Sequence, residues 1–214
     1  MSSKKNFDFI RFDLTMLVEI INNNTNFLVT GGSSVDYFLK KVINKKDFNN
    51  NKKNFYLSDE RITSKLKDTN FYKIQKFLKK KKNIKFIKIN NYPKNLLLES
   101  EQYSKKLSKK IDVAFLSLGE KFHIASLFFN YPVIHSSKYA SITYSDDFNF
   151  LRISVNKKLF SRIKKIYLFI NGKNKLKQFN LMVKKNILNF YFDKKTQKKI
   201  SLIYKDKKNK SKNH

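Results

Sequence analysis

The stretch Phe27-Leu28-Val29-Thr30-Gly31-Gly32-Ser33-Ser34 decides the fold, because an apolar run ends there in two glycines and a helical pattern follows directly. The run is short enough to be a buried strand, and apolar residues then recur at helical spacing from Val35 to Val42. A strand, a glycine turn and a helix in this order form the first part of a parallel βαβ unit. The sequence therefore predicts an α/β protein.

The same alternation continues along the chain on both sides of this stretch. Apolar runs predict strands over residues 54–57, 84–89, 112–118, 151–155, 166–170 and 200–204. Helical spacing predicts helices over residues 13–21, 70–78, 93–107, 157–163 and 176–183. A short helix after His123 and an irregular stretch as far as Asp147 are also expected. We expect one Rossmann-like domain over residues 1–204, a mostly parallel sheet with helices on both faces. Residues 205–214 read as a basic tail without a fixed fold.

The charge of the chain is extreme. Lys and Arg number 47 against 16 Asp and Glu, a formal net charge of +31. A nucleic-acid binder would account for this charge, but such proteins concentrate arginine and lysine on one surface. Here lysine is spread along the whole chain, and only Arg11, Arg61, Arg152 and Arg162 are arginine. Gly, Pro and Trp are scarce as well, which fits a drift toward AT-rich codons. We therefore expect the charge to be mainly compositional and nucleic acid not to be a partner.

The composition also excludes several classes of protein. The chain has no Cys, so it has neither a disulfide scaffold nor a thiolate metal site. Three His barely allow an all-histidine zinc site. No apolar run reaches the ~18–20 residues needed to cross a bilayer, and the first residues lack the apolar core of a secretory signal. A cytoplasmic protein without a metal is the expectation.

Polar residues follow the predicted strands at the edge where parallel sheets bind their ligands. The segments are Gly31-Gly32-Ser33, Asp59-Glu60-Arg61, Gly119 to His123, and Gly172 to Lys175. Each one alone has a plain structural explanation. The glycines fit a tight turn, the charged triplet fits a surface ion pair, and His123 fits a packed histidine near a helix start. Their order and spacing together are far more specific than any one of them.

That order resembles the 6-phosphogluconolactonase family, within the larger group that includes glucosamine-6-phosphate isomerase/deaminase. Matches to its motifs run collinearly through residues 29–33, 57–61, 68–71, 116–128, 151–154 and 171–175. The most specific match is residues 116–128, which contain the family's His-x-Ala-Ser-Leu-Phe run. The resemblance implies hydrolysis of 6-phosphogluconolactone to 6-phosphogluconate in the oxidative pentose phosphate pathway, without metal or organic cofactor.

The resemblance also implies roles for individual residues. We expect His123 to be the general base, because an unperturbed imidazole is largely neutral near pH 7. Asp59 is expected to orient His123 or a polar group of the sugar. The expected substrate-binding and phosphate-binding residues are Gly31, Gly32, Ser33, Arg61, Asn70, Arg152 and Lys175. Two of the four arginines fall in this set, and a guanidinium fork matches phosphate geometry.

The chain departs from the family pattern beside the histidine. Lys121-Phe122 stands where the lactonases have Asp-Gly, and Phe tolerates the left-handed backbone of a glycine turn poorly. Lys121 is interpreted either as a solvated loop residue or as an extra cation near the phosphate. The deaminases need carboxylates at the positions of Lys121 and Phe128, which disfavours deaminase activity. A related isomerase or deaminase, a non-catalytic sugar-phosphate binder and a basic RNA binder stay open as alternatives. His135 reads as non-functional.

Overall fold

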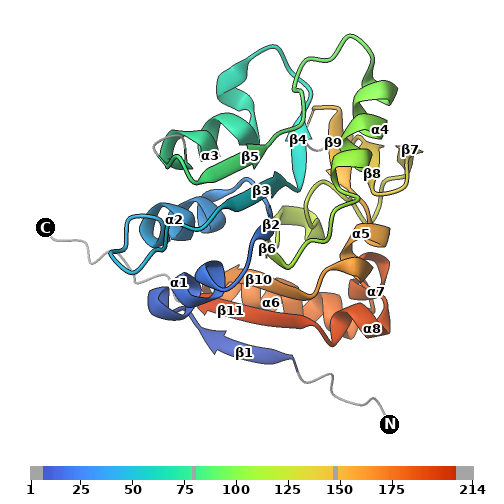
Figure 1. The fold of residues 1–214 in the computed structure, drawn as a ribbon. Helices are drawn as coiled ribbons and strands as arrows, with labels where there is room; N and C mark the ends of the chain where they lie inside the picture. The colour runs from blue at the N-terminus through green and yellow to red at the C-terminus, as the bar shows by residue number, and fades with distance from the viewer. Residues whose placement is uncertain (1–6, 79–80, 147–148, 206–214) are drawn as a thin grey trace, which may run out of the picture.

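The structure, a computed structural model, describes residues 7–78, 81–146 and 149–205 (Figure 1), without the side chains of Ser33, Ser34 and Phe77. Its main element is a seven-stranded parallel sheet in the order β1-β11-β10-β6-β2-β3-β5. The strands are β1 (Asp8–Arg11), β2 (Asn26–Val29), β3 (Lys53–Leu57), β5 (Ile84–Ile87), β6 (Val113–Ser117), β10 (Lys165–Asn171) and β11 (Ile200–Lys205). The predicted α/β class with a mostly parallel sheet is confirmed.

Helices cover both faces of this sheet, as predicted. One face packs against α1 (Leu14–Asn22), α2 (Ser33–Val42) and α3 (Asn70–Leu78). The other packs against α4 (Leu96–Lys106), α5 (Lys157–Arg162), α6 (Gly172–Lys184) and α7 (Leu188–Tyr191). The short helix α8 (Lys194–Gln197) contacts α5. Stacked rings of Phe27, Phe55 and Phe115 fill the first face where β3, β2 and β6 lie side by side. Burial of such rings is a main source of core stability.

A second, antiparallel sheet was not predicted. It has the order β4-β9-β8-β7 and lies next to α4 (Figure 1). Its strands are β4 (Asp59–Arg61), β9 (Arg152–Val155), β8 (Ala140–Thr143) and β7 (Val133–Ser136). The expected irregular stretch as far as Asp147 is therefore wrong, because it contains β7 and β8; Asp147 itself lies outside the described residues. The predicted strand at residues 151–155 is confirmed, as β9, but it belongs to this sheet.

Ser58 is the point where the chain passes from the large sheet to the small one. Its N–H donates to Val29 O of β2 at 2.8 Å, and its own carbonyl accepts from Val155 N of β9 at 2.7 Å. Asp59 follows directly, at the corner between the two sheets. The segment from Asp59 to Arg61 is thus a short strand, although it contains no apolar residue.

Three smaller corrections concern helix and chain ends. The expected short helix after His123 lies before it, as the 3₁₀ helix η2 (Glu120–Phe122), so His123 follows a helix end. A second 3₁₀ helix, η1 (Leu66–Asp68), precedes α3. Lys205, placed in the tail by sequence, closes β11, and residues 206–214 lie outside the described part of the chain. In the described ranges, no helix is long and apolar enough to cross a membrane.

Candidate functional site

A polar cavity of about 300 Å³ lies at the carboxyl ends of β2, β3 and β6, where the large sheet meets the small one. It is lined by Thr30, Gly31, Gly32, Asp59, Arg61, Asn70, Ser117, Leu118, Gly119, Glu120, His123, Ala125, Arg152 and Lys175. Every residue predicted for the site except Ser33 belongs to this lining. Ser33 begins α2 beside the cavity, and its side chain lies outside the described part of the structure. Residues far apart in sequence are thus brought together as predicted.

Asp59 is the centre of a buried hydrogen-bond network. Its Oδ1 accepts from Ser58 Oγ at 2.6 Å, and its Oδ2 accepts from Ser126 Oγ at 2.7 Å. The Asn70 side-chain amide donates to the same Oδ2 at 3.1 Å and to Asp59 O at 3.0 Å. Arg152 Nη1 lies 3.9 Å from Oδ2 and donates to Ser126 Oγ at 3.3 Å. The carboxylate is therefore fixed in position, and the interpretation as a surface ion pair is wrong.

Asn70 contributes to the site through Asp59, because its side-chain amide donates to both the carbonyl and the carboxylate of that residue. It also explains one glycine of the motif. A Cβ on Gly31 would lie only 2.4 Å from Asn70 Cγ, so no larger residue fits there without displacing the amide. Gly32 has a φ of 148°, which L side chains rarely adopt, and it precedes the first turn of α2. The two glycines thus let the backbone and the N-terminus of α2 approach the cavity.

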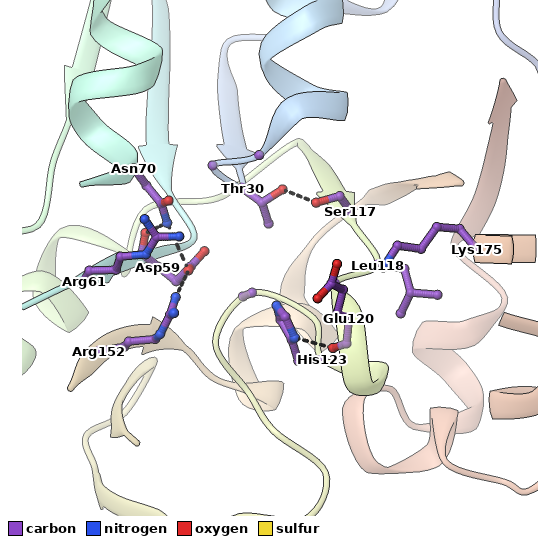
Figure 2. Close-up of a pocket in the computed structure, with 14 residues that line it drawn as sticks. Thr30, Asp59, Arg61, Asn70, Ser117, Leu118, Glu120, His123, Arg152 and Lys175 are labelled. Carbon is purple, nitrogen blue, oxygen red and sulfur yellow. Dashed lines mark hydrogen bonds and ion pairs between the residues drawn. The ribbon is translucent and has the colours of Figure 1, made fainter. Parts of the chain in front are cut away.

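Arg61 and Arg152 stand opposite each other in the β4–β9 ladder and reach the cavity from the same side (Figure 2). Arg61 is half-buried and donates to Asp68 O, and its guanidinium lies 5.9 Å from the centre of the Phe150 ring. Arg152 is buried, which lowers its pKa, while the nearby Asp59 carboxylate raises it. Lys175, on the first turn of α6, enters from the other side (Figure 2).

His123 is held against the main chain. Its Nδ1 is 2.6 Å from Glu120 O, so Nδ1 carries the proton and Nε2 keeps the lone pair. A Cβ on Gly119 would lie 2.0 Å from His123 Nε2, so the ring occupies the space that a side chain would need. Burial lowers the pKa of His123, against smaller raising effects of the bond to Glu120 O and of Asp59. The imidazole is therefore neutral near pH 7 and able to accept a proton.

The turn before His123 has an unusual backbone. Lys121 and Phe122 have φ values of 50° and 64°, in the left-handed region that favours glycine. The glycine-like turn is thus kept although neither residue is glycine. Lys121 is exposed and is not among the residues that line the cavity, which favours the solvated-loop interpretation. Tyr191 Oη donates to Phe122 O at 2.6 Å and fixes the far side of the turn.

Glu60 is a fully buried carboxylate that the sequence did not single out. Its oxygens accept from the backbone N–H groups of Arg61, Asn70 and Phe71 at 2.8, 2.7 and 2.7 Å. Two of these donors begin α3, so Glu60 caps that helix from β4. Burial raises the pKa of Glu60 to about 7, although the three N–H groups oppose the shift.

Several lining residues were missed as site residues, although most stand inside the quoted motifs. Thr30 Oγ1 and Ser117 Oγ lie 3.2 Å apart on the cavity wall. Glu120 brings an exposed carboxylate to the cavity, and the buried Ser126, outside the lining, donates to Asp59. Small hydroxyl residues carry no distinctive spacing, so only the fold reveals their role. Within the described ranges, no three Asp, Glu or His side chains group as metal ligands.

The fold and this cavity define an α/β protein with a cation-rich polar pocket that surrounds a neutral histidine. The chain belongs to the family of glucosamine-6-phosphate isomerases and 6-phosphogluconolactonases, whose family model matches residues 13–190. This confirms the family suggested by the motifs. Members of the family are enzymes that act on sugar phosphates. A comparison with curated protein sequences finds no match.

Solved structures share the fold over nearly the whole chain. A 6-phosphogluconolactonase from Shewanella baltica has a TM-score of 0.77 at 18% identity and covers 94% of this chain and 98% of its own. One from Plasmodium vivax has a TM-score of 0.76 at 19% identity, with coverages of 94% and 90%. A monomeric glucosamine-6-phosphate deaminase has a TM-score of 0.72 at 13% identity, with coverages of 92% and 96%. At these identities the likeness concerns the fold alone.

Proposed function

We propose that this chain hydrolyses 6-phosphogluconolactone to 6-phosphogluconate in the oxidative pentose phosphate pathway, in the cytoplasm. The observation that carries the proposal is the setting of His123. Its Nδ1 is bonded to Glu120 O, and its ring stands between Arg61 and Arg152 on one side and Lys175 on the other (Figure 2). A neutral base among cationic groups is what hydrolysis of a phosphorylated lactone requires.

The reaction uses His123 twice. Nε2 takes a proton from water while the water oxygen attacks the lactone carbonyl carbon. The carbonyl oxygen gains negative charge, and the ring C–O bond then breaks. The imidazolium returns its proton to the departing ring oxygen, which becomes a hydroxyl group, and the new carboxylic acid loses a proton to solvent. A positioned base of this kind contributes roughly 10²–10⁴ in rate.

The other residues bind and orient the substrate. Arg61, Arg152 and Lys175 supply three cationic groups for the phosphate, of which the two arginines can bind it in a bidentate manner. The N-terminus of α2 after Gly31 and Gly32 supplies backbone N–H groups. In this proposal Asn70 holds Asp59 in position. Asp59 in turn orients a polar group of the sugar and stabilises the protonated form of His123.

Purified protein tests this proposal in an assay of 6-phosphogluconolactone hydrolysis above its spontaneous background. The wild type should accelerate the reaction, and His123→Ala should lose turnover while it still binds the product 6-phosphogluconate. His135→Ala, in β7 and outside the cavity lining, is the matched control and should keep full activity. Full turnover by His123→Ala would overturn the assignment of the base. Binding without turnover by the wild type would identify a non-catalytic sugar-phosphate binder.

A related isomerase or deaminase is the second candidate, favoured by one observation. Glu120 brings a carboxylate to the cavity in addition to Asp59, and acid–base steps on an amino sugar need several such groups. The positions where the deaminases need carboxylates hold the exposed Lys121 and the buried Phe128. Release of ammonia from glucosamine 6-phosphate, with no acceleration of lactone hydrolysis, would favour this second function.

A further inference from the structure

Gln178 connects Lys175 to the turn that precedes His123. It lies on α6 one turn after Lys175, and the two residues share a helix face. Its Nε2 donates to Gly119 O at 2.8 Å, and its Oε1 accepts from Lys175 Nζ at 3.3 Å. One carboxamide therefore joins the ammonium group of the proposed phosphate site to the turn that carries His123.

The orientation of this carboxamide follows from its two partners. A carbonyl oxygen such as Gly119 O can only accept, and an ammonium group such as Lys175 Nζ can only donate. If the amide were reversed, Oε1 would face the acceptor Gly119 O, and Nε2 would face the donor Lys175 Nζ, so both hydrogen bonds would be lost. Only the orientation with Nε2 toward Gly119 satisfies both contacts.

Gly119 contacts both the backbone and the side chain of His123. Gly119 N donates to His123 O at 2.8 Å, and the imidazole packs against Gly119 so closely that no Cβ fits between them. The turn between them holds Lys121 and Phe122 in the left-handed region, which is strained for residues that have a side chain. Such a turn persists only when its surroundings fix it. Gln178 fixes it at Gly119, and Tyr191 fixes it at Phe122.

We propose that Gln178 is a positioning residue that couples phosphate binding at Lys175 to the order of the turn that carries His123. The inference rests on the proposed function, in which Lys175 binds phosphate and His123 is the base. An ammonium group has three donors, so Lys175 can bind phosphate and Gln178 together. Phosphate that holds Lys175 in place also holds Gln178 against Gly119. Binding energy from the phosphate, remote from the reacting carbon, is thus used to order the base.

Backbone amide hydrogen exchange of Gly119 and His123 measures this coupling without any turnover. Inorganic phosphate should slow exchange of these two amides in the wild type, because it secures the turn. Gln178→Met removes both hydrogen bonds at similar side-chain length and should abolish most of the slowing. Gln102→Met, on the exposed side of α4, is the matched control and should respond like the wild type. Equal slowing in Gln178→Met, or none in the wild type, would overturn the coupling.

Kinetics give a second readout. Gln178→Met should lower kcat for 6-phosphogluconolactone by about fivefold, the contribution of the lost hydrogen bond to Gly119 O, and should affect phosphate-free gluconolactone less. Gln178→Glu has the same size but faces Gly119 O with an acceptor, so it should also lose kcat. Wild-type kcat in Gln178→Glu would mean that the side chain only fills space. If no lactone is turned over at all, the proposed function fails, while the exchange result still decides the coupling.

Discussion

Arg61 and Arg152 are direct register partners across the antiparallel pair of β4 and β9. Side chains of such partners point to the same face of a sheet, and like charges placed there destabilise the pair. Two contacts reduce this repulsion in part. Arg61 donates a hydrogen bond to Asp68 O, and Arg152 forms an ion pair with Asp59. An anion between the guanidinium groups would relieve the remaining repulsion, which supports the proposal that they bind the phosphate together with Lys175.

Inorganic phosphate should therefore raise the Tm of the wild type, and Arg61→Lys or Arg152→Lys should reduce that rise. Lysine keeps the charge but loses the planar fork that binds two phosphate oxygens, so KM for the lactone should increase about tenfold. Thermal shift with and without phosphate measures the effect. Arg162→Lys is the control, since Arg162 is exposed and bonds Ser108 O outside the cavity lining. A phosphate shift that is the same in all three variants would contradict this assignment.

The fall of kcat/KM at low pH, the acid limb of the pH–rate profile, should reflect protonation of His123. Burial lowers the pKa of this imidazole below its ordinary 6.5, so the neutral, proton-accepting form persists to lower pH. kcat/KM should rise with pH through an apparent pKa below 6.5 and then level off. The limb should remain in Glu60→Gln, because the buried Glu60, with a pKa raised to about 7, is not the base. A limb centred above 7 would argue against His123.

Gly119→Ala should abolish most activity without unfolding the protein. Its Cβ would lie 2.0 Å from His123 Nε2, so the ring must move, whereas the φ of Gly119, −76°, is allowed for alanine. A displaced base costs about 10²-fold in rate. Gly31→Ala is the comparison, since its Cβ meets Asn70 Cγ at 2.4 Å and disturbs Asp59 instead. Circular dichroism confirms folding, and retained kcat in Gly119→Ala would show that His123 needs no such support.

How far the sequence predicts this site depends on how each residue is placed. Gly31, Asp59, His123 and Lys175 follow apolar runs, and parallel strands end at a common edge, so their meeting in one cavity could be predicted. The bond between Ser126 and Asp59 could not. Ser126 stands in the His-x-Ala-Ser-Leu-Phe run, but it is 67 residues away from Asp59, and only the packing of the small sheet on the large one brings the two together.

The small sheet was missed for a related reason. Its strands are short. Ala140–Thr143 has only four residues, three of which have small or polar side chains, so its composition resembles that of a loop, although all four residues are buried. Asp59–Arg61 is charged throughout and has no strand signal at all. Its strand conformation comes from pairing with β9 after the crossover at Ser58. Tertiary pairing, not local propensity, decides such segments.

Glu60 should make the stability of the protein fall as pH rises through weak acidity. Its pKa is raised from about 4.5 to about 7 on folding, so between these values the folded state holds the proton more tightly than the unfolded chain. Stability from this group is thus present below pH 4.5 and lost as pH passes 7. Gln does not titrate. From pH 4 to pH 8 the free energy of unfolding of the wild type should therefore fall by roughly 3 kcal/mol relative to that of Glu60→Gln.

Urea unfolding of both proteins at several pH values tests this prediction. Comparing the pair cancels groups common to both, such as Asp36, whose pKa is also raised by burial, to about 6. Glu60→Gln keeps an oxygen for Arg61 N and Asn70 N but loses the acceptor for Phe71 N. The variant should therefore be less stable than the wild type at pH 4, and this difference in free energy of unfolding should narrow toward pH 8. A gap that widens with pH would mean that the three N–H groups, not burial, decide the charge of Glu60.

Lys121→Gly should stabilise the protein. Lys121 is exposed and has a φ of 50° and a ψ of 37°, a conformation that costs an ordinary L residue about 1–2 kcal/mol and glycine almost nothing. Part of this gain is offset because glycine is more flexible in the unfolded chain, so the free energy of unfolding should rise by about 0.5–1 kcal/mol. Lys158→Gly, in the right-handed helix α5, is the matched control and should lose about 1 kcal/mol. If both variants are destabilised equally, the left-handed turn before His123 is not where the backbone strain lies.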